Sequence, residues 1–399
     1  MPILPPVMDN PFPFGRPLSR DELIDRHAEI ESVVRTVRTH GTLFLIGPRR
    51  FGKTSVLRAA DEVLTKQGAI VLRHDAEAYP GLDALVQAIV ATAAARLGGR
   101  IEHVGEKISA FFGRLRPEVS FNTATHTWSA RLGLERGGAT ASQTPLLLEA
   151  LDGVAALAAA SRHSVALVLD EFQRVIELGG PTAEAQIRAT IQEHDRVAYI
   201  FAGSKTHLLN DMTLNPARPF YRLGARLFLG PIPRPDYIDG LTRGFAATGC
   251  QVEPDGIAAI LELSADVPYN VQALAHTAWE LLRAPADRAL TRAVVLRARD
   301  QLVSQDDPFY ASVWNALTVP QQRALIAVIE TNGRRLQSQA VTRGAGLAPA
   351  TMRKSLLALE QRSIIRREEA VGDLHWQLED PFLGAWVLAA VAAGRPSPR

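Results

Sequence analysis

One short stretch near the amino end constrains the fold of this chain more than any other feature. Residues 47–55 read Gly-Pro-Arg-Arg-Phe-Gly-Lys-Thr-Ser and fit the pattern G-x-x-x-x-G-K-[ST] without a mismatch. In this pattern the glycines let backbone N–H groups turn inward around phosphates. The lysine contacts the β and γ phosphate oxygens, and the hydroxyl of the next residue ligates Mg²⁺. The apolar run Thr42–Ile46 precedes the loop, and Ser55–Lys66 has the apolar spacing of a helix. The sequence therefore predicts a strand, a phosphate-binding loop and a helix in succession.

We call Gly47–Thr54 the phosphate loop. A glycine-rich turn that matches by chance is the alternative, with odds on the order of one in a hundred from average residue frequencies. We expect Lys53 to be catalytic and Thr54 to ligate Mg²⁺. The residues predicted to bind ATP here are Gly47, Pro48, Arg49, Arg50, Phe51, Gly52, Lys53, Thr54 and Ser55.

A phosphate loop needs an acidic group at the end of a neighbouring strand to hold Mg²⁺. The apolar run Val165–Leu169 has the length of a buried strand, and Asp170 and Glu171 follow it directly. We expect Asp170 to serve the metal and Glu171 to act as general base on an attacking water. An acidic pair that merely ends a strand is the alternative.

Two further polar positions follow the next apolar run, Val197–Ala202. Ser204 is a candidate contact to the γ-phosphate or the attacking water, although a helix N-cap is nearly as good an interpretation. Arg222, or Arg218 before it, is a candidate arginine finger on developing charge, with a surface salt bridge as the alternative.

The bulk composition limits the class of protein. With 44 basic and 42 acidic residues the formal net charge is +2, so any nucleic-acid site must be a local patch. The single cysteine, Cys250, excludes an internal disulfide and favours a reducing compartment. The start lacks the pattern of a signal peptide, and the longest apolar runs fall short of the roughly 20 residues of a membrane span. We therefore expect a soluble cytoplasmic protein with no membrane partner.

Strand-like and helical segments alternate through the first part of the chain, which predicts an α/β domain with a parallel sheet. A stretch at about 118–135 breaks the alternation with a period of two, and we interpret it as an inserted β-hairpin. The pattern turns helical from Pro235. The predicted boundaries are 1–20 for an extended segment, 21–234 for the core, 235–305 for a helical lid and 306–399 for a C-terminal domain.

The C-terminal domain has the pattern of a winged helix-turn-helix. Helical spacing in Pro320–Glu330, Ser338–Gly344 and Ala348–Gln361 is followed by strand-like Ser363–Arg367 and Leu374–Leu378. Winged helices also serve as protein-interaction modules, so double-stranded DNA and a protein partner are equally open. The candidate DNA contacts are Thr351, Arg353 and Lys354 on the third helix and Arg362, Arg366 and Arg367 near phosphates.

These residues together resemble the archaeal-type P-loop ATPases, on the branch shared by AAA+ and STAND proteins. The resemblance covers nearly the whole chain, and the plan of core, lid and winged helix is similar to that of the origin-recognition group. The motifs that carry it are Asn10-Pro11-Phe12…Gly15, Leu23-Ile24-Asp25-Arg26…Glu29, the phosphate loop, Leu169-Asp170-Glu171-Phe172-Gln173, Ala202-Gly203-Ser204 and Asp380-Pro381-Phe382…Trp386.

The resemblance implies a five-stranded parallel sheet, ATP with Mg²⁺, and a lid that folds over the nucleotide. It places Asp170 and Glu171 at the Mg²⁺ and water positions, Ser204 at the sensor and Pro268 at the nucleotide. Two departures concern the lid. The lid motif of the STAND branch is G-x-P, and the corresponding stretch here is Asp266-Val267-Pro268, in which Asp266 stands in place of the glycine. In addition, no arginine matches the second sensor of standard AAA+ proteins.

The leading hypothesis is an ATPase that cleaves the β–γ phosphoanhydride and whose nucleotide state rearranges the lid and winged helix, changing contact with DNA or a protein. A homo-oligomer in which a second protomer supplies an arginine is compatible with it. The absence of an Asn-Lys-x-Asp motif favours ATP over GTP. One alternative is a non-hydrolysing ATP-dependent switch, for which Glu171 is dispensable. The other is a DNA-binding regulator that uses the ATPase fold as an oligomerisation scaffold.

Overall fold

The computed structural model of the chain describes residues 9–98, 112, 115, 117–122, 127–132, 144–161, 163–283, 288–370 and 373–392. Their contacts divide the chain into two units. Pro17–Gly230 form the core unit, and Met1–Arg16 together with Pro231–Arg399 form the second unit.

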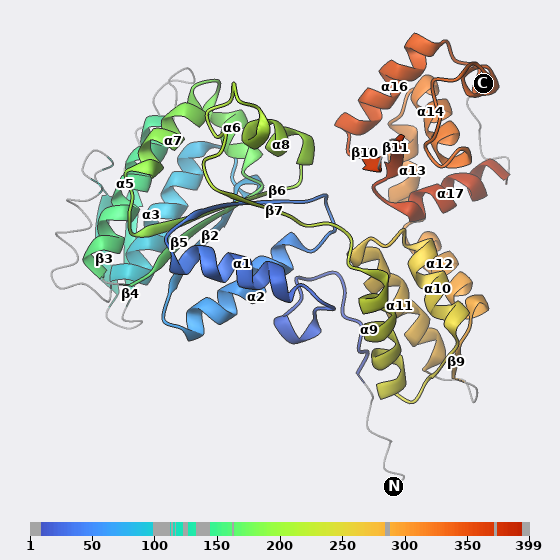
Figure 1. The fold of residues 1–399 in the computed structure, drawn as a ribbon, viewed down its shortest axis with the longest axis horizontal. Helices are drawn as coiled ribbons and strands as arrows, with labels where there is room; N and C mark the ends of the chain where they lie inside the picture. The colour runs from blue at the N-terminus through green and yellow to red at the C-terminus, as the bar shows by residue number, and fades with distance from the viewer. Residues whose placement is uncertain are drawn as a thin grey trace, which may run out of the picture. The chain divides into compact units, whose positions relative to one another are not determined.

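A five-stranded parallel sheet lies at the centre of the core unit, as predicted (Figure 1). Its order is β2-β5-β6-β1-β7. The strands are β1 (Thr42–Ile46), β2 (Ile70–Asp75), β5 (Val165–Asp170), β6 (Val197–Gly203) and β7 (Ala225–Phe228). The inner strands are continuous apolar runs because helices cover both of their faces. Parallel pairing places the carboxyl ends of all five strands at one edge.

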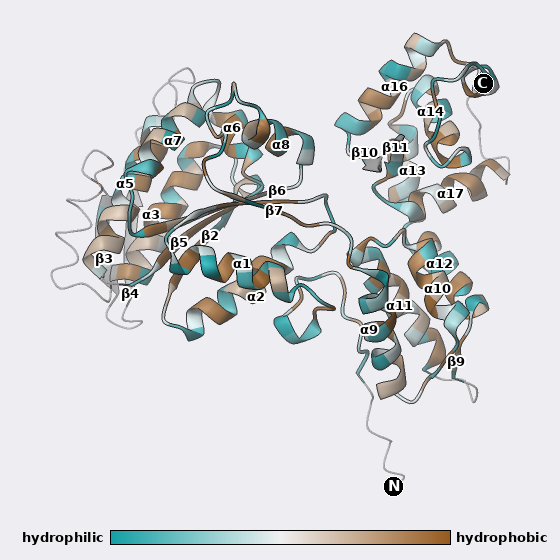
Figure 2. Ribbon diagram, viewed as in Figure 1, coloured by the Kyte–Doolittle hydropathy of each residue, from teal (hydrophilic) through white to brown (hydrophobic). Residues whose placement is uncertain are grey.

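Helices cover the two faces of this sheet. On one face lie α1 (His27–Arg38) and α2 (Lys53–Lys66), and on the other lie α3 (Leu82–Gly98), α5 (Thr144–Ser161) and α7 (Ala183–Gln192). Figure 2 shows apolar residues concentrated in the strands and in the inner faces of the helices. Shorter elements complete the unit: η1 (Arg20–Glu22), η2 (Ala76–Ala78), α6 (Gln173–Gly179) and α8 (Thr206–Leu214).

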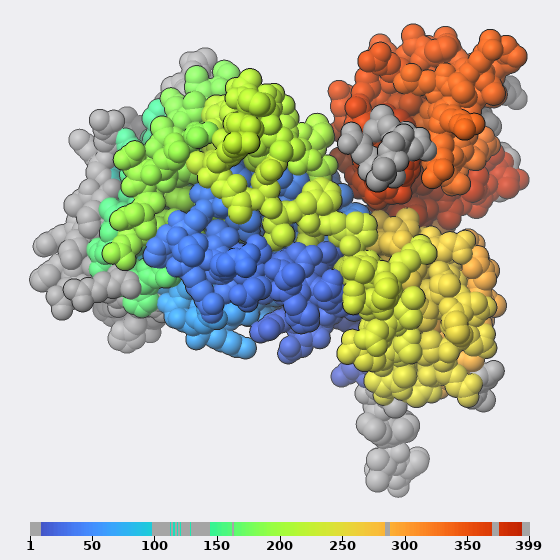
Figure 3. Space-filling model, viewed as in Figure 1, coloured from blue at the N-terminus to red at the C-terminus, as the bar shows by residue number. Residues whose placement is uncertain are grey.

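The space-filling view shows early and late segments of the core unit against one another. The blue segment around α1 and the yellow-green segment before residue 230 share one surface (Figure 3). The pairing of β1 with both β6 and β7 requires this contact, because β1 comes first among the strands and β6 and β7 come last.

The inserted stretch forms an antiparallel pair of strands, β3 (Pro117–Asn122) and β4 (Thr127–Leu132). Residues 123–126 and 133–135 of the hairpin predicted at about 118–135 lie outside the described residues. Among the described helices, α5 alone has the length and apolar composition of a membrane span. Half of α5 is buried, and its residues Leu147, Leu151, Val154 and Leu157 belong to the core of the unit. The apolar composition of α5 is therefore that of a core helix.

The second unit begins with a helical part. It contains α9 (Arg234–Ala247), β8 (Gln251–Val252), α10 (Pro254–Leu263), α11 (Pro268–Leu282), β9 (Ala289–Leu290) and α12 (Arg292–Gln305). Proline in the first turn starts α9, α10 and α11, where its missing N–H costs nothing.

The extended N-terminal segment packs on this helical part. Phe12 is 2% exposed and its ring centroid lies 4.5 Å from that of Phe245 on α9. The ring fits because residue 244 is glycine, where a Cβ would lie 2.6 Å from Phe12. His276 Nδ1 donates to the Phe12 carbonyl at 2.8 Å, and Asn10 Nδ2 donates to the His276 carbonyl at 3.1 Å. Apolar burial and two hydrogen bonds therefore hold residues 10–12 on α9 and α11.

The remainder of the second unit contains α13 (Asp307–Asn315), α14 (Val319–Glu330), α15 (Gln339–Gly344), α16 (Pro349–Gln361) and α17 (Pro381–Ala392), with β10 (Ile365–Ala370) paired antiparallel to β11 (Asp373–Leu378). The Thr318 capping box starts α14 and the Ser338 side chain caps α15. Three helices followed by a two-stranded ribbon is the element order predicted for a winged helix. The turn residues 371 and 372 lie outside the described residues.

Candidate nucleotide site

The phosphate loop connects β1 to α2 at the carboxyl edge of the sheet. Gly52 precedes α2 with φ 89° and ψ 17°, a left-handed conformation that glycine adopts without strain. Gly47 faces a different constraint, because a Cβ there would lie 2.8 Å from the Leu229 carbonyl oxygen. Both glycines of the sequence pattern therefore have a physical reason, one in backbone conformation and one in close packing.

Lys53 and Thr54 both point back toward the edge of the sheet. Lys53 is 6% exposed, and its Nζ donates to the carbonyls of Gly47 at 2.9 Å and Pro48 at 3.0 Å. Thr54 Oγ1 donates to Asp170 Oδ2 at 3.2 Å. The structure thus brings together the ammonium, the hydroxyl and the carboxylate that the sequence assigned to one phosphate site.

Asp170 carries an electrostatic cost in this position. Burial raises the pKa of its carboxyl, and the charge of Glu171 raises this pKa further, against the opposing charge of Lys53. A buried carboxylate of this kind is stabilised by a cation.

The donor set fits Mg²⁺, which keeps several waters and takes few protein ligands when it also binds substrate phosphates. Thr54 and Asp170 supply a hydroxyl and a carboxylate oxygen. Within the described ranges no group of three or more His, Cys, Asp or Glu side chains forms an all-protein metal cage. Thr54 and Asp170 are therefore the residues that would hold the metal with its nucleotide.

Glu171 is held by three hydrogen bonds to one of its carboxylate oxygens. Oε2 accepts from Ser204 Oγ at 2.8 Å, from the Ser204 N–H at 3.2 Å and from Gln173 Nε2 at 2.5 Å. Burial by itself would raise the pKa of Glu171, but the hydrogen bonds from Gln173 and Ser204 and the charge of Lys53 outweigh it and lower this pKa. Glu171 stays an anion that can accept a proton.

The backbone at Glu171 is strained. Its φ is 49°, a conformation that costs a non-glycine residue of order 1–3 kcal/mol. This turn directs the Glu171 side chain toward Ser204 at the end of β6. The N-cap position of α8 belongs to Lys205, which makes no side-chain cap, so the Ser204 hydroxyl serves Glu171 and not the helix end.

Gln173 belongs to a motif that carries the resemblance, but no role was predicted for it from the sequence. It is 1% exposed at the start of α6, and a Cβ at residue 203 would lie 2.3 Å from its Oε1. The available signal was a polar residue among the buried apolar residues that follow Glu171.

Arg222 is exposed and lies next to the edge strand β7. It precedes β7, whose Ala225 pairs with Leu43 and whose Phe228 pairs with Ile46. The amino end of β7, at Ala225, is therefore about 10 Å from its carboxyl end at Phe228, at roughly 3.3 Å per residue. Its guanidinium lies over the Tyr221 ring. A finger role for Arg222 stays a prediction.

Arg218 makes ion pairs, and a salt bridge was the alternative to a finger role for this residue. It bonds Glu184, and its Nη1 lies 3.4 Å from Asp211 Oδ2. Pro268 begins α11 in the second unit, so its predicted contact with the nucleotide also stays a prediction.

The six candidate DNA contacts differ in their surroundings. Arg353 and Lys354 on α16 are exposed, and Thr351 is half-buried. The three arginines after the helix are engaged within their own unit. Arg362 donates to the Ala316 carbonyl, Arg366 donates to Leu378 and Gln377, and Arg367 bonds Glu360 and lies over Trp376. Arg353 and Lys354 remain the pair best placed to meet a phosphate backbone.

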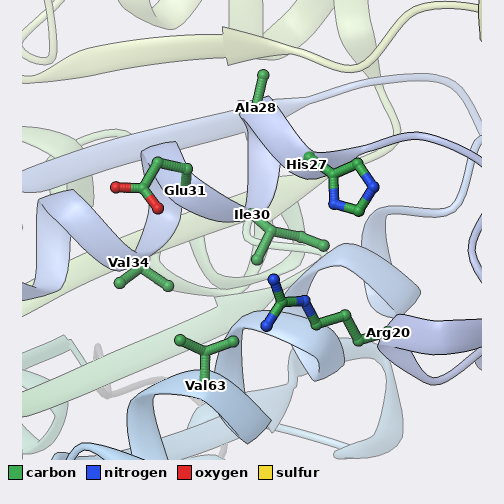
Figure 4. A pocket seen from close by; sticks show the side chains of 7 residues that line it. All are labelled: Arg20, His27, Ala28, Ile30, Glu31, Val34 and Val63. Carbon is green, nitrogen blue, oxygen red and sulfur yellow. The ribbon is translucent and has the colours of Figure 1, made fainter.

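A cavity of about 380 Å³ lies away from the phosphate loop (Figure 4). It opens between η1, α1 and α2, with Arg20 and His27 beside an apolar floor of Ile30, Val34 and Val63. Val63 is three turns along α2 from Lys53, about 15 Å at the rise of an α-helix. The cavity is therefore separate from the site built around Lys53 and Asp170.

Comparison with known proteins agrees with this geometry. The sequence model of the AAA ATPase domain family matches residues 16–201. The fold is similar to the Walker-type ATPase of Pyrococcus abyssi, with a TM-score of 0.62 and 15% identity over 95% of this chain and 99% of that chain. It is also similar to the ORC2 protein of Aeropyrum pernix, solved as ADPNP–ADP complexes, with a TM-score of 0.53 and 16% identity over 93% and 95%. No protein of curated function matches the sequence.

The resemblance noted in the sequence is therefore confirmed at the level of domain and fold. The match of the family model includes the phosphate loop and Asp170, and the likeness to the Pyrococcus abyssi structure covers nearly the whole chain. Residues 16–201 match the sequence model of the AAA ATPase domain family, and the fold is similar to that of a Walker-type P-loop ATPase.

Proposed function

We propose that this protein is a cytoplasmic, Mg²⁺-dependent ATPase that hydrolyses the β–γ bond of ATP and transmits its nucleotide state to the second unit. The observation that carries the proposal is the convergence of Lys53, Thr54, Asp170 and Glu171 at one edge of the sheet. Lys53 would meet the β and γ oxygens, Thr54 and Asp170 would hold Mg²⁺, and Glu171 would accept the proton of the attacking water. Mg²⁺ would supply charge neutralisation on the phosphates.

The two places where the chain passes from one unit to the other support the proposed link between nucleotide state and the second unit. The chain passes between the units at residues 16–17 and 230–231. Beside the first crossing, the Leu18 N–H donates at 3.0 Å to Oγ of Ser55, the residue that follows the phosphate loop. Beside the second, the Leu229 N–H donates at 2.7 Å to the carbonyl of Ile46, the residue that precedes the loop. A movement of the phosphate loop on binding phosphates would therefore be transmitted through these two hydrogen bonds to both crossings.

Arg26 holds the chain in place at the second crossing, residues 230–231. It is buried, its Nη2 donates to the Gly230 carbonyl at 2.6 Å, and its Nη1 lies 2.8 Å from Glu29. Residues 10–12 continue from the first crossing onto α9 and α11 of the second unit. We infer that ATP binding changes the position of the helical part, and with it the C-terminal elements that present Arg353 and Lys354 to DNA.

Phosphate release tests this function most directly. Wild type and Glu171→Gln are assayed with Mg²⁺, each with and without double-stranded DNA, and Lys53→Ala serves as the nucleotide-binding control. We expect turnover in wild type, its loss in Glu171→Gln with ATP binding retained, and weakened ATP binding in Lys53→Ala. Stimulation by DNA would support coupling to the C-terminal elements.

Two results would contradict the proposal. ATP binding by calorimetry without phosphate release from wild type would identify a non-hydrolysing switch. Unchanged DNA affinity in Lys53→Ala, measured with and without ATP, would leave the ATPase fold as a scaffold.

An arginine finger supplied by a second copy would show as turnover that rises with protein concentration and falls in Arg222→Ala without loss of ATP affinity.

A further inference from the structure

Gln173 has a buried environment that its packing alone does not explain. It is 1% exposed, and its Nε2 donates to Glu171 Oε2 at 2.5 Å. Its other amide atom, Oε1, is buried and takes no hydrogen bond from the residues that the structure describes. A methionine or leucine would fill the same space without leaving an acceptor unpaired. The unpaired acceptor costs stability, and the hydrogen bond of the amide goes to the candidate general base.

The chemistry of the two partners determines how the amide faces. A carboxylate oxygen can only accept, so the NH₂ of Gln173 must face Glu171 and Oε1 must face away. Oε1 then occupies the space next to residue 203, and a Cβ there would lie 2.3 Å from it. The slot for the amide exists because β6 ends in Gly203, directly before Ser204.

The three donors to Glu171 all use the same oxygen. Ser204 Oγ, the Ser204 N–H and Gln173 Nε2 converge on Oε2, while Oε1 of Glu171 takes no hydrogen bond within the described part of the chain. A carboxylate anchored by one oxygen presents the other in a defined direction. This is the arrangement that a general base needs, because proton transfer depends on geometry before it depends on pKa.

We propose that Gln173 is a positioning residue that anchors Oε2 of Glu171 and so presents Oε1 to the water that attacks the γ-phosphorus. The inference rests on the proposed function, in which Glu171 is the base. In the step that it serves, the water oxygen forms a bond to the γ-phosphorus and its proton passes to Glu171 Oε1. The bond from the γ-phosphorus to the bridging oxygen breaks, and the electron pair leaves on ADP. Gln173 touches neither ATP nor water and acts through Glu171.

The test compares wild type with Gln173→Met, which matches the length of the side chain and removes the donor. Steady-state phosphate release is measured against ATP concentration and against pH, and ATP affinity is measured by calorimetry. We expect kcat to fall about tenfold or more, as loss of one hydrogen bond to a charged group implies, with ATP affinity unchanged. We also expect the acid limb of kcat to move to higher pH, because losing a donor to the charged form raises the pKa of Glu171.

A second substitution and a stability measurement separate positioning from packing. Gln173→Glu keeps the shape but places a second carboxylate against Glu171, so turnover at neutral pH should fall below that of Gln173→Met. Melting temperature should be equal or higher in Gln173→Met, because the unpaired Oε1 is gone. Wild-type kcat and an unshifted pH profile in a folded Gln173→Met would overturn the inference and leave the ATPase standing. Wild-type turnover that survives in Glu171→Gln would overturn both the base and its positioning residue.

Discussion

The hydroxyl of Thr54 donates to Oδ2 of Asp170 across 3.2 Å, joining residues 116 positions apart in the sequence. The contact links the start of α2 to the end of β5 and places the two proposed metal ligands side by side. It also keeps a carboxylate buried beside Glu171, and this arrangement has a measurable effect on stability.

Asp170→Asn should abolish Mg²⁺-dependent phosphate release and raise the melting temperature of the nucleotide-free protein at neutral pH. The pKa of Asp170 is raised in the fold, chiefly by burial, so the native state loses stability as pH rises from the unfolded pKa of 3.8 through the folded value. The stabilisation by Asp170→Asn should therefore vanish near pH 3. Thermal unfolding at several pH values measures it. Asp239→Asn, at an exposed position on α9, is the control and should change little. Equal melting curves for Asp170→Asn and wild type at neutral pH would contradict the argument.

Gly203→Ala should reproduce the kinetic effect of removing the Gln173 amide. The added Cβ would lie 2.3 Å from Gln173 Oε1 and 2.6 Å from Leu209 Cδ1, so the amide must move away from Glu171. We expect lower kcat with the acid limb at higher pH. Phosphate release across pH measures both. Gly344→Ala is the matched control because no atom lies within 4 Å of its Cβ position. A fully active Gly203→Ala protein would show that the amide position is unimportant.

Phe12→Ala should loosen the helical part of the second unit. The ring is 2% exposed and packs on Phe245, and truncating a buried phenylalanine costs about 3–5 kcal/mol. Faster hydrogen exchange of the amides in α9 and α11, beneath the N-terminal segment, would report this loss. Phe228→Ala removes an exposed ring and should stay within about 0.5 kcal/mol of wild type. Unchanged protection of α11 in Phe12→Ala would argue against a structural role for residues 10–12.

His74 should make the core unit sensitive to acid. Burial, with the charge of Arg96 as a smaller cause, lowers the pKa of the ring from 6.5 to about 4. The folded state therefore keeps the ring neutral while the unfolded chain binds a proton, so this contribution is intact above pH 6.5 and is lost as pH falls toward 4. At about 1.4 kcal/mol per pKa unit the loss is about 3 kcal/mol at most.

His74→Gln removes the titration, so its stability relative to wild type should improve progressively between pH 6.5 and 4. Urea unfolding of both proteins at pH 7, 6 and 5 measures the difference. Parallel curves for the two proteins across this range would show that the ring titrates normally in the fold.

Arg353→Ala combined with Lys354→Ala should weaken binding to double-stranded DNA. Both side chains are exposed on α16, whereas Arg366 is engaged with Leu378 and Gln377. If both meet phosphates, the slope of log affinity against log salt should decrease by about 2. Fluorescence anisotropy at several salt concentrations measures the slope. Arg243→Ala, which removes one exposed positive charge on α9, is the control for a general loss of surface charge. Identical titrations for the double variant and wild type would reject this surface and favour a protein partner.

Local pattern was sufficient for the parts of this protein that depend on neighbouring residues. The loop from Gly47 to Thr54, the buried strand before it, the helix after it and the acidic pair at 170–171 are all contiguous, and their spacing carries their chemistry. Alternating strands and helices then imply a parallel sheet, which places all strand ends at one edge. For this reason Thr54 and Asp170 were predicted together although they are far apart in sequence.

Only the tertiary structure decided which polar side chains meet. The register of β7 on β1 places Ala225, three residues after Arg222, opposite Leu43, and a register is set by packing across strands. The bonds of Arg366 within its own unit and of Gln173 to Glu171 depend on loops and slots such as the one at Gly203. Gln173 is only two residues from Glu171, but the two side chains meet because the backbone turns at Glu171 and the fold leaves room beside Gly203, and spacing along the chain encodes neither.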